Sequence, residues 1–346
     1  GHEDGSESWK HVALMPGLFH AKIADCHGLL EVHFGKPNAA TRSPGSLAFH
    51  NTVLDRLPIT LTSLPSFRVC RDLIMVSLYA RILHCLLLVT EMDTLHAAAA
   101  SIDSWETFVG HARSIREQYA NADVVQDLRD ERNLAECKQA AETDPSPERT
   151  MRVLAGDMVF ENGLLFIRDG LHTRAFTDAI KAGDSGRIIV ILKIWAFAYR
   201  GSGRTKYAHE MLHIIHNLVN VWPKAFRDII INNWLQNPTG KDNAFVEVDL
   251  IQEHLNFWIK RVYKADGDAH SWDWLAMVAP CIEVLRHLAR SLNAELGLQQ
   301  GSKHTSPGLQ RDIERLMQSL ELHRVYRLQK GWRLDSDEEP VPDIVA

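Results

Sequence analysis

Cysteine is scarce in this chain, and its few cysteines are not spaced as a metal or redox motif. They are dispersed over 346 residues, with no C-x-x-C pair, at Cys26, Cys70, Cys85, Cys137 and Cys281. An odd, dispersed set is typical of reduced thiols in an intracellular protein. An apolar leader is also lacking, because residues 1–10 are polar and acidic. We therefore expect an intracellular protein, nuclear or cytoplasmic.

Positive charge is in deficit as well. The formal net charge is −6, so no overall attraction draws the chain toward nucleic acid or an acidic membrane. Contact with nucleic acid would need a local basic patch. The sequence motifs of serine hydrolases, dinucleotide-binding enzymes and kinases are missing too. No serine or cysteine nucleophile can therefore be named.

Strand-like runs are almost absent, whereas helical spacing is frequent. One short apolar run, residues 11–15, ends at Pro16 and Gly17. Beyond the helical spacing of residues 21–34, the apolar periodicity predicts helices at 67–91, 104–120, 122–141, 148–158, 163–182, 185–199, 204–220, 223–235, 248–263, 272–291 and 307–321. The hydrophobic content of 45% is enough for a sizeable core. We predict a mainly α protein, a large helical domain with one or two short N-terminal strands.

Segments rich in proline, glycine and polar residues divide the chain into three parts. Residues 35–65 hold several prolines and glycines and predict an irregular loop. Residues 1–65 then form an N-terminal strand–helix segment with this loop, and residues 66–295 form the helical domain. Residues 296–346 form a C-terminal helix and an acidic tail, which we expect to be disordered.

One apolar run is long enough to raise the question of a membrane. Residues 73–89 are strongly apolar, but 17 residues fall short of a comfortable span, and the run contains Arg81 and His84. Charged side chains are costly within a bilayer. We predict a buried core helix and no membrane partner.

Residues 246–260 carry the strongest chemical pattern, with Glu247, Asp249, Glu253 and His254 inside eight positions. On a helix over 248–263, Asp249 and Glu253 share one stripe, and His254 lies at its flank. The same stripe continues with Asn256 and Lys260, and the opposite, core-facing stripe consists of Ile251, Leu255, Trp258 and Val262.

This pattern leaves two interpretations open. Asp249 and Glu253 could bind Mg²⁺ or Mn²⁺ with a third ligand from elsewhere, which would make Asp249, Glu253 and His254 the catalytic candidates. Alternatively, the two carboxylates only decorate the first turns of a helix, where negative charge favours the helix dipole.

Residues 200–220 hold a second candidate. Arg200, Arg204 and Lys206 surround two glycines before a helix, and free amides with cationic side chains can bind an anion or a phosphate. The spacing is not that of a Walker loop, and the alternative is a basic turn between helices. On the following helix, one stripe contains His209, His213, His216 and Asn220, which could bind zinc or could simply face solvent.

A third candidate lies at residues 15–28. The strand-like run ends at Pro16 and Gly17, and the helix that follows carries His20, Asp25 and His27. Such a junction can present His20 at the edge of a sheet. The alternative is a packed strand–helix corner.

Several of these segments together resemble one family. The chain is similar, over residues 9–295, to fungal proteins expanded in basidiomycetes and known as a domain of unknown function. The resemblance is carried by MPGLFHAKIADCHG, FGKPNAATRSPGSLAFHN, RDGLHTRAFTDAIKAGDSGRI, GRTKYAHEMLHIIHNL, NNWLQNPTGKDNAFVEVDLIQEHLNFWIK and SWDWLAMVAPCIEVLRHL. The patterns G-R-T-x-Y-A-x-E from Gly203 and D-L-x-x-E-H-x-N from Asp249 also resemble more distant animal sequences, and the combination of motifs is specific.

The resemblance implies a descent from a mobile element. The order of a strand–helix with a histidine, a long helical insertion and a late helical glutamate resembles RNase H-like transposases, which hold two metal ions with three carboxylates. Glu253 would then be the late carboxylate, and the short N-terminal strands would remain from an α/β core. The family's upstream aspartate-bearing strand is missing here, so the chain looks N-terminally truncated and inactive.

Three functional hypotheses follow. The first is a transposase-derived, catalytically degenerate protein that contacts nucleic acid, which would be a metal-dependent nuclease-like enzyme only when full length. The second is a non-enzymatic helical scaffold that binds another protein. The third is a zinc-binding module that uses the histidines of residues 209–216.

Overall fold

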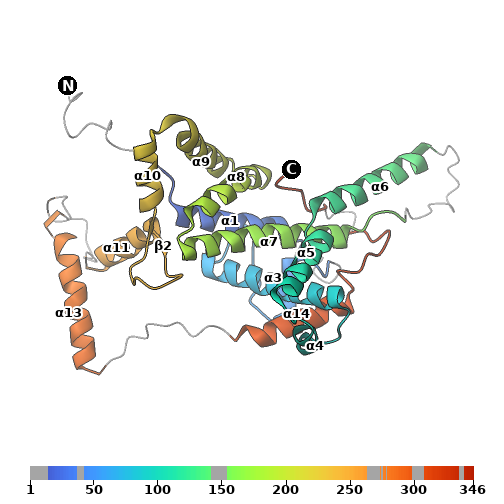
Figure 1. Cartoon of the computed structure of the whole chain (residues 1–346), viewed down its shortest axis with the longest axis horizontal. Helices are drawn as coiled ribbons and strands as arrows, with labels where there is room; N and C mark the ends of the chain where they lie inside the picture. The colour runs from blue at the N-terminus through green and yellow to red at the C-terminus, as the bar shows by residue number, and fades with distance from the viewer. Residues whose placement is uncertain are drawn as a thin grey trace.

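The computed structural model describes residues 15–36, 43–141, 154–262, 273, 276–277, 279–297, 308–334 and 339–346. Its elements are α1 (Leu18–His33), α2 (Leu47–Val53), α3 (Phe67–Thr90), α4 (Leu95–Ala100), α5 (Trp105–Tyr119), α6 (Ala122–Ala141), α7 (Met158–Ala182), α8 (Ser185–Gly201), α9 (Thr205–His216), a π-helical turn (Asn217–Val221), α10 (Lys224–Asn233), β1 (Leu235–Gln236), β2 (Val246–Glu247), α11 (Val248–Val262), a 3₁₀ turn (Ala279–Cys281), α13 (Ile282–Glu295) and α14 (Leu309–Leu322). The mainly α class is therefore confirmed (Figure 1).

The described strands are not those that the sequence predicted. β1 and β2 form one small antiparallel sheet, in which Leu235 pairs with Glu247 and Gln236 with Val246. They lie late in the chain, whereas the strand-like residues 11–14 fall outside the described residues. Of the predicted helix 148–158, residues 148–153 lie outside them as well.

Two helices occupy the middle of the molecule. α1 and α7 run side by side, with α3 packed on both from one side and α8 on both from the other (Figure 1). α7 begins where buried Asp157 accepts hydrogen bonds from the amides of Val159 and Phe160, and it ends at Gly183, whose φ is +72°. This helix also covers residues 159–162, where the sequence had predicted a break between two helices. Gly163 lies just after that point. The ring of Tyr326 packs against Gly163, and its hydroxyl donates to the Gly163 carbonyl at 3.1 Å.

The buried apolar residues form two clusters, and α1 and α7 contribute to both. The first, here called the α3 core, includes Leu30, Leu73, Leu78, Leu164 and Leu320. The second, the α8 core, includes Leu18, Phe176, Ile191, Trp195 and Met211. The α3 core joins residues from α1 to α14, so buried packing crosses both expected boundaries, at residues 65 and 295.

The long apolar helix α3 is a core helix. Among the described residues it is the one helix long and apolar enough to span a membrane, but more than half of its most apolar stretch is buried inside the protein. Arg81 is fully buried, donates to Ser77 Oγ at 3.1 Å and to Tyr326 Oη at 2.8 Å, and lies over the ring of Phe166. A paired arginine in this position belongs to a protein interior, as predicted.

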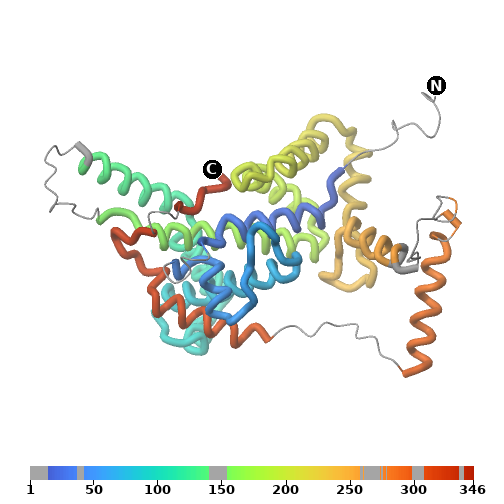
Figure 2. Tube along the Cα trace, turned by 180° about the vertical axis from the view of Figure 1, so that it is seen from behind, coloured from blue at the N-terminus to red at the C-terminus, as the bar shows by residue number. Residues whose placement is uncertain are grey.

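Two segments differ from the sequence prediction. The predicted loop 35–65 contains helix α2, which starts where Ser46 Oγ accepts the amide of Phe49. The tail was expected to be disordered because it is acidic, and over residues 339–346 this is wrong. Ile344 is only 5% exposed, in the α8 core, and Val341 packs on the α3 core. Figure 2 shows this segment running from α7 toward α8.

Candidate functional site

The strongest sequence candidate, Asp249, caps another helix. Its Oδ1 accepts the amide of Phe19 at 3.0 Å, and its Oδ2 accepts the amide of His20 at 3.1 Å. Both amides belong to the first turn of α1, where backbone donors have no partner within the helix. Gly17 allows this approach, because a Cβ there would collide with the Asp249 carboxylate. Asp249 therefore fastens α11 to the N-terminus of α1.

His20 lies between the two acidic candidates. Its Nδ1 is 3.0 Å from Asp249 Oδ2, and its Nε2 is 3.7 Å from Glu253 Oε1. The imidazole ring thus separates the two carboxylates instead of joining them around one ion. Among the described residues, no group of three or more His, Cys, Asp or Glu side chains is arranged to hold a metal ion. These residues do not fit the Mg²⁺ or Mn²⁺ site that the transposase resemblance implies.

The remaining predictions for this helix have mixed outcomes. α11 covers Val248–Val262, and Ile251 and Leu255 are only partly buried and belong to neither core cluster of the described residues. The side chains of Trp258 and Val262 lie outside the described residues. His254 is exposed, and within the described part of the chain no hydrogen bond or ion pair joins it to Asp249 or Glu253.

A buried ion pair strengthens the same junction. Lys22 on α1 pairs with Glu247 on β2, and Glu247 is only 2% exposed. The Lys22 ammonium also lies 5.4 Å from the ring centre of Phe19 and 6.0 Å from that of Phe67. Glu247 and Asp249 thus belong to an anchoring cluster that holds α1 against the β2–α11 segment.

The basic segment 200–206 is divided by the structure. Arg200 and Lys206 are exposed, and Gly203, with φ +76°, makes the turn between α8 and α9. Arg204 instead points back to α1, where its Nη2 is 3.0 Å from Glu31 Oε1. Arg204 is thus part of the packing between helices, while an anion site at Arg200 and Lys206 stays a prediction.

The histidines of α9 lie on one exposed surface. His209, His213 and His216 line a shallow open hollow with Leu212 and Asn217. His216 Nδ1 lies 3.2 Å from Asn220 Nδ2. The predicted stripe is therefore present, but the described histidines, cysteines and carboxylates, these three included, form no group of three or more arranged to hold a metal ion.

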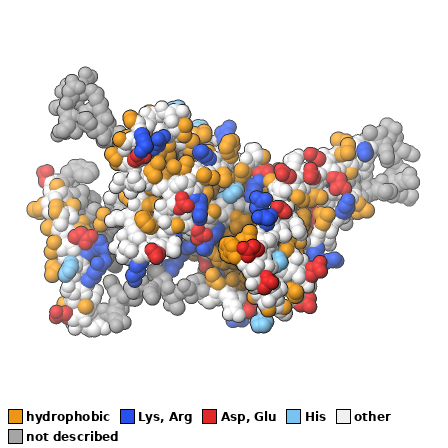
Figure 3. All heavy atoms as spheres, in the orientation of Figure 1, with side chains coloured by type: hydrophobic (Ala, Val, Ile, Leu, Met, Phe, Trp, Pro, Cys, Tyr) orange, Lys and Arg blue, Asp and Glu red, His pale blue; other side chains and the backbone are white. Residues whose placement is uncertain are grey.

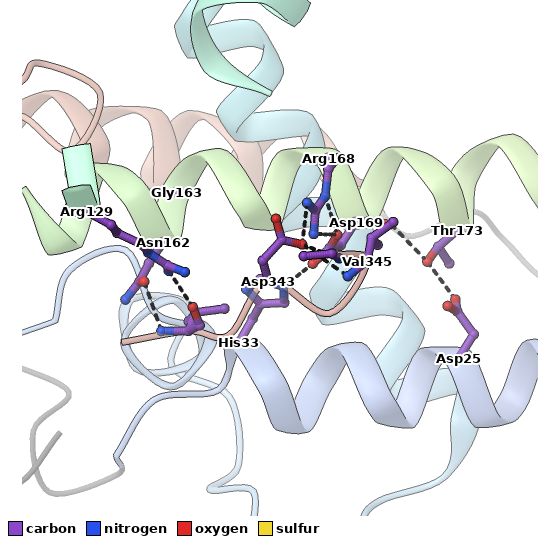
Figure 4. Close-up of polar contacts among 12 residues, drawn as sticks. Asp25, His33, Arg129, Asn162, Gly163, Arg168, Asp169, Thr173, Asp343 and Val345 are labelled. Carbon is purple, nitrogen blue, oxygen red and sulfur yellow. Dashed lines mark hydrogen bonds and ion pairs between the residues drawn. The ribbon is translucent and has the colours of Figure 1, made fainter. Parts of the chain in front are cut away.

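The third candidate, around His20 and Asp25, is split between two places. His20 belongs to the α11 junction, whereas Asp25 is buried deeper, between α1 and α7. Its Oδ2 accepts the hydroxyl of Thr173 at 2.6 Å (Figure 4). Burial raises the pKa of Asp25 to about 7, although the Thr173 hydrogen bond lowers it.

Sequence reasoning missed the polar cluster beside Asp25. His33 Nε2 lies 2.9 Å from Asp169 Oδ2, and Arg168 Nε donates to Asp169 Oδ1 at 2.8 Å (Figure 4). Burial raises the pKa of Asp169, but His33 and Arg168 outweigh it, and the net pKa is lowered. The available signal was the pair Arg168–Asp169 inside an otherwise apolar helical stretch.

Comparison with known proteins shows the family of this chain. One family model matches residues 1–304. The chain belongs to the family of unknown function DUF6589. This membership confirms the resemblance to a domain of unknown function. A search of curated proteins and one of solved structures found no match.

The DUF6589 match covers some of the residues described above and leaves others outside. The anchoring cluster, the α8–α9 turn and the polar cluster around Asp169 all lie within residues 1–304. Helix α14 and residues 339–346 lie outside it, although they pack on matched residues in both cores.

Proposed function

We propose that this member of DUF6589 is a non-catalytic nucleic-acid-binding protein, and that the exposed face of α8 and α9 contacts the phosphate backbone. The observation that carries the proposal is the composition of one stripe of α8. Its exposed side chains follow one another at helical spacing and alternate basic with apolar: Arg187, Val190, Lys193, Phe197 and Arg200.

The charge of this region is opposite to that of the chain. Between Asp184 and Asp228 the single acidic residue is Glu210, whereas seven lysines and arginines fall in the same interval. Some of them are already paired, since Arg187 lies 3.5 Å from Asp184 and Lys224 lies 2.7 Å from Asp228. The exposed cations Lys193, Arg200 and Lys206 remain as the candidates for phosphate contact.

The exposed face of α9 extends this surface. Lys206, His209 and His213 are exposed on α9, which packs directly on α8. Figure 3 shows basic and histidine side chains among apolar ones over this part of the molecule. Cationic side chains bind the phosphates of any sequence, and an exposed phenylalanine such as Phe197 can stack on a base.

The proposal keeps the transposase descent that the resemblance implies but not the catalytic activity. We propose an intracellular fungal protein of transposase descent in which Asp249 has become a helix cap, because both of its oxygens accept α1 amides. A gene that encodes an aspartate-bearing strand upstream of residue 1 would support the descent and would reopen the question of nuclease activity.

Fluorescence anisotropy with labelled single- and double-stranded DNA tests the binding proposal. In the triple variant Lys193→Gln, Arg200→Gln, Lys206→Gln, we expect weaker binding to every sequence. The steepness of log affinity against log salt should decrease by about 3 for double-stranded and about 2 for single-stranded DNA, because each lost phosphate contact removes roughly 0.9 or 0.7.

A matched variant controls for net charge. Arg113→Gln, Lys138→Gln, Lys241→Gln removes the same three charges from exposed positions outside this face. This control should keep most of the affinity and the salt slope. Equal losses in the two variants would show that only net charge matters, and an unchanged slope in the first variant would refute the proposal.

A further inference from the structure

Residues 339–346 lie in a groove between α1, α7 and the C-terminal end of α8, here called the tail groove. Its walls include His33, Asn162 and Arg168 (Figure 4), and Gly201 at the end of α8. The segment has no regular secondary structure over most of its length, so its backbone must find partners on the groove. The way it finds them resembles the capture of a ligand.

The groove holds the backbone of Val341 from both sides. Asn162 Oδ1 accepts the Val341 amide at 3.1 Å, and Arg129 Nη2 donates to the Val341 carbonyl at 2.6 Å (Figure 4). Side chains that satisfy a backbone amide and carbonyl recognise an extended chain whatever its side chain is at that position.

The groove also recognises one charge. Arg168 Nη1 donates to Asp343 Oδ1 at 2.7 Å, and the Arg168 side chain is 12% exposed. Asp343 Oδ1 in turn accepts the amides of Val345 and Ala346, which folds the segment into a turn over α7. A charge-assisted bond of this kind selects a carboxylate at that position.

A glycine creates the space for the next residue. A Cβ on Gly201 would lie 2.6 Å from Ile344 Cα and 2.7 Å from its carbonyl oxygen, so only glycine permits this approach. Ile344 then enters the α8 core and is 5% exposed. The pattern that the groove reads is an aspartate followed by a branched aliphatic residue.

The segment does not fill its groove. A cavity of about 300 Å³ remains between it and residues such as His33 and Asn162. Trp195, beside Ile344 and Val345, has a buried indole N–H with no hydrogen-bond partner among the described residues. The groove residues named above lie within the DUF6589 match, whereas residues 339–346, and Leu334 at the edge of the cavity, lie outside it. The groove could therefore accommodate a larger occupant.

We propose that the tail groove is a peptide-binding site for an extended segment of another protein that carries an aspartate followed by a branched aliphatic residue. Residues 339–346 of this chain occupy the groove in place of that segment. This proposal concerns a different surface from the nucleic-acid face and does not depend on it. A partner segment must displace residues 339–346, so it must bind the groove more strongly than they do.

A labelled peptide of residues 339–346 tests the proposal by fluorescence anisotropy on the full chain. The native chain should bind it poorly, because its own tail is present at a high effective concentration. In the full-length variant Asp343→Ala, Ile344→Ala, which loosens the tail, we expect peptide binding to be at least about tenfold tighter. A loosened chain that is folded by circular dichroism and yet binds the peptide no better than the native chain would overturn the proposal.

Matched changes identify the contacts. Adding Gly201→Val or Arg168→Ala to the loosened chain should abolish the gain, and a peptide N-methylated at Val341 should bind weakly because it cannot donate to Asn162. Equal binding of the methylated peptide would refute recognition of the backbone. If the native chain elutes as a dimer and the loosened chain as a monomer, the occupant is a second copy of this chain, and the assignment to another protein is wrong.

Discussion

At the scale of single residues, Asp25 and Asp169 show how partners decide the state of a buried acid. Both lie between α1 and α7 and are less than a tenth exposed. Asp169 has His33 and Arg168 as partners, and its pKa is lowered. Asp25 has the neutral hydroxyl of Thr173, and burial raises its pKa to about 7. Asp25 is thus a buried acid whose ionisation opposes folding.

Replacing Asp25 with asparagine should stabilise the protein in a way that depends on pH. The raised pKa means that the folded state holds the proton more tightly than the unfolded state, so stability is lost as pH rises from about 4 to about 7. The amide of the Asp25→Asn variant has no proton to lose, and its oxygen can still accept the Thr173 hydroxyl. We expect the advantage of the variant in urea denaturation to grow over this window to a few kcal/mol, at about 1.4 kcal/mol per pH unit, and to stay level above it.

Asp169→Asn is the control with the opposite sign. The pKa of Asp169 is lowered, so its ion pair with Arg168 and its hydrogen bond with His33 contribute stability at neutral pH, and the substitution should destabilise the protein there. A pH-independent effect of Asp25→Asn would contradict the buried, protonatable state of Asp25.

At the scale of elements, helix α11 shows what a sequence pattern can and cannot reveal. Periodicity placed Asp249 and Glu253 on one stripe of α11, opposite the predicted core-facing stripe, but in the structure both side chains lie against α1. The pattern could not reveal the partner, because Asp249 caps an amide 230 residues earlier in the chain. The structure fully supports neither of the two interpretations, a metal site and a role in α11 itself. Asp249 does interact with a helix N-terminus, but with that of α1 and not of its own helix.

This arrangement predicts different effects for the two acidic side chains. Asp249→Ala removes the cap from α1, and we expect it to lower the free energy of unfolding by about 1–2 kcal/mol, the usual value of an N-cap. The Glu253 side chain is 44% exposed, and its ion-pair partner in the described part of the chain is His20, at 3.7 Å. Glu253→Gln should therefore change stability by less than about 0.5 kcal/mol. Urea denaturation measures both.

Calorimetry with Mn²⁺ separates this interpretation from a catalytic site. Neither the native chain nor Glu253→Gln should bind Mn²⁺ tightly, because the ring of His20 separates the two carboxylates. Tight binding by the native chain that disappears in Glu253→Gln would show that the pair is a metal site after all.

At the scale of the whole molecule, the class of fold was predictable but the assembly was not. Apolar periodicity indicated most of the helices, and it correctly kept α3 in the core because of Arg81 and His84. Periodicity shows which face of a helix is buried but not what covers it. The packing of α14 on α3 and the buried position of Ile344 therefore could not be predicted. The acidic composition of the tail also led to a wrong expectation of disorder, because Asp343 pairs with Arg168.

The sharing of α1 and α7 by both cores predicts cooperative unfolding. The α3 core and the α8 core lie on different parts of the same two helices, so neither can open without disturbing a helix that supports the other. Leu78→Ala, at a fully buried position in the α3 core, should cost about 2–5 kcal/mol. We expect it to reduce hydrogen-exchange protection of the α9 amides in low denaturant as much as that of the α3 amides.

The reciprocal variant completes this test. Met211→Ala opens a cavity in the α8 core and should lower protection in α3 to the same extent as in α9, since Met211 is also fully buried. If each substitution affected protection only in its own core, the two clusters would be separate folding units and α1 and α7 would not couple them. Equal losses in both regions, for both variants, are what a single cooperative unit requires.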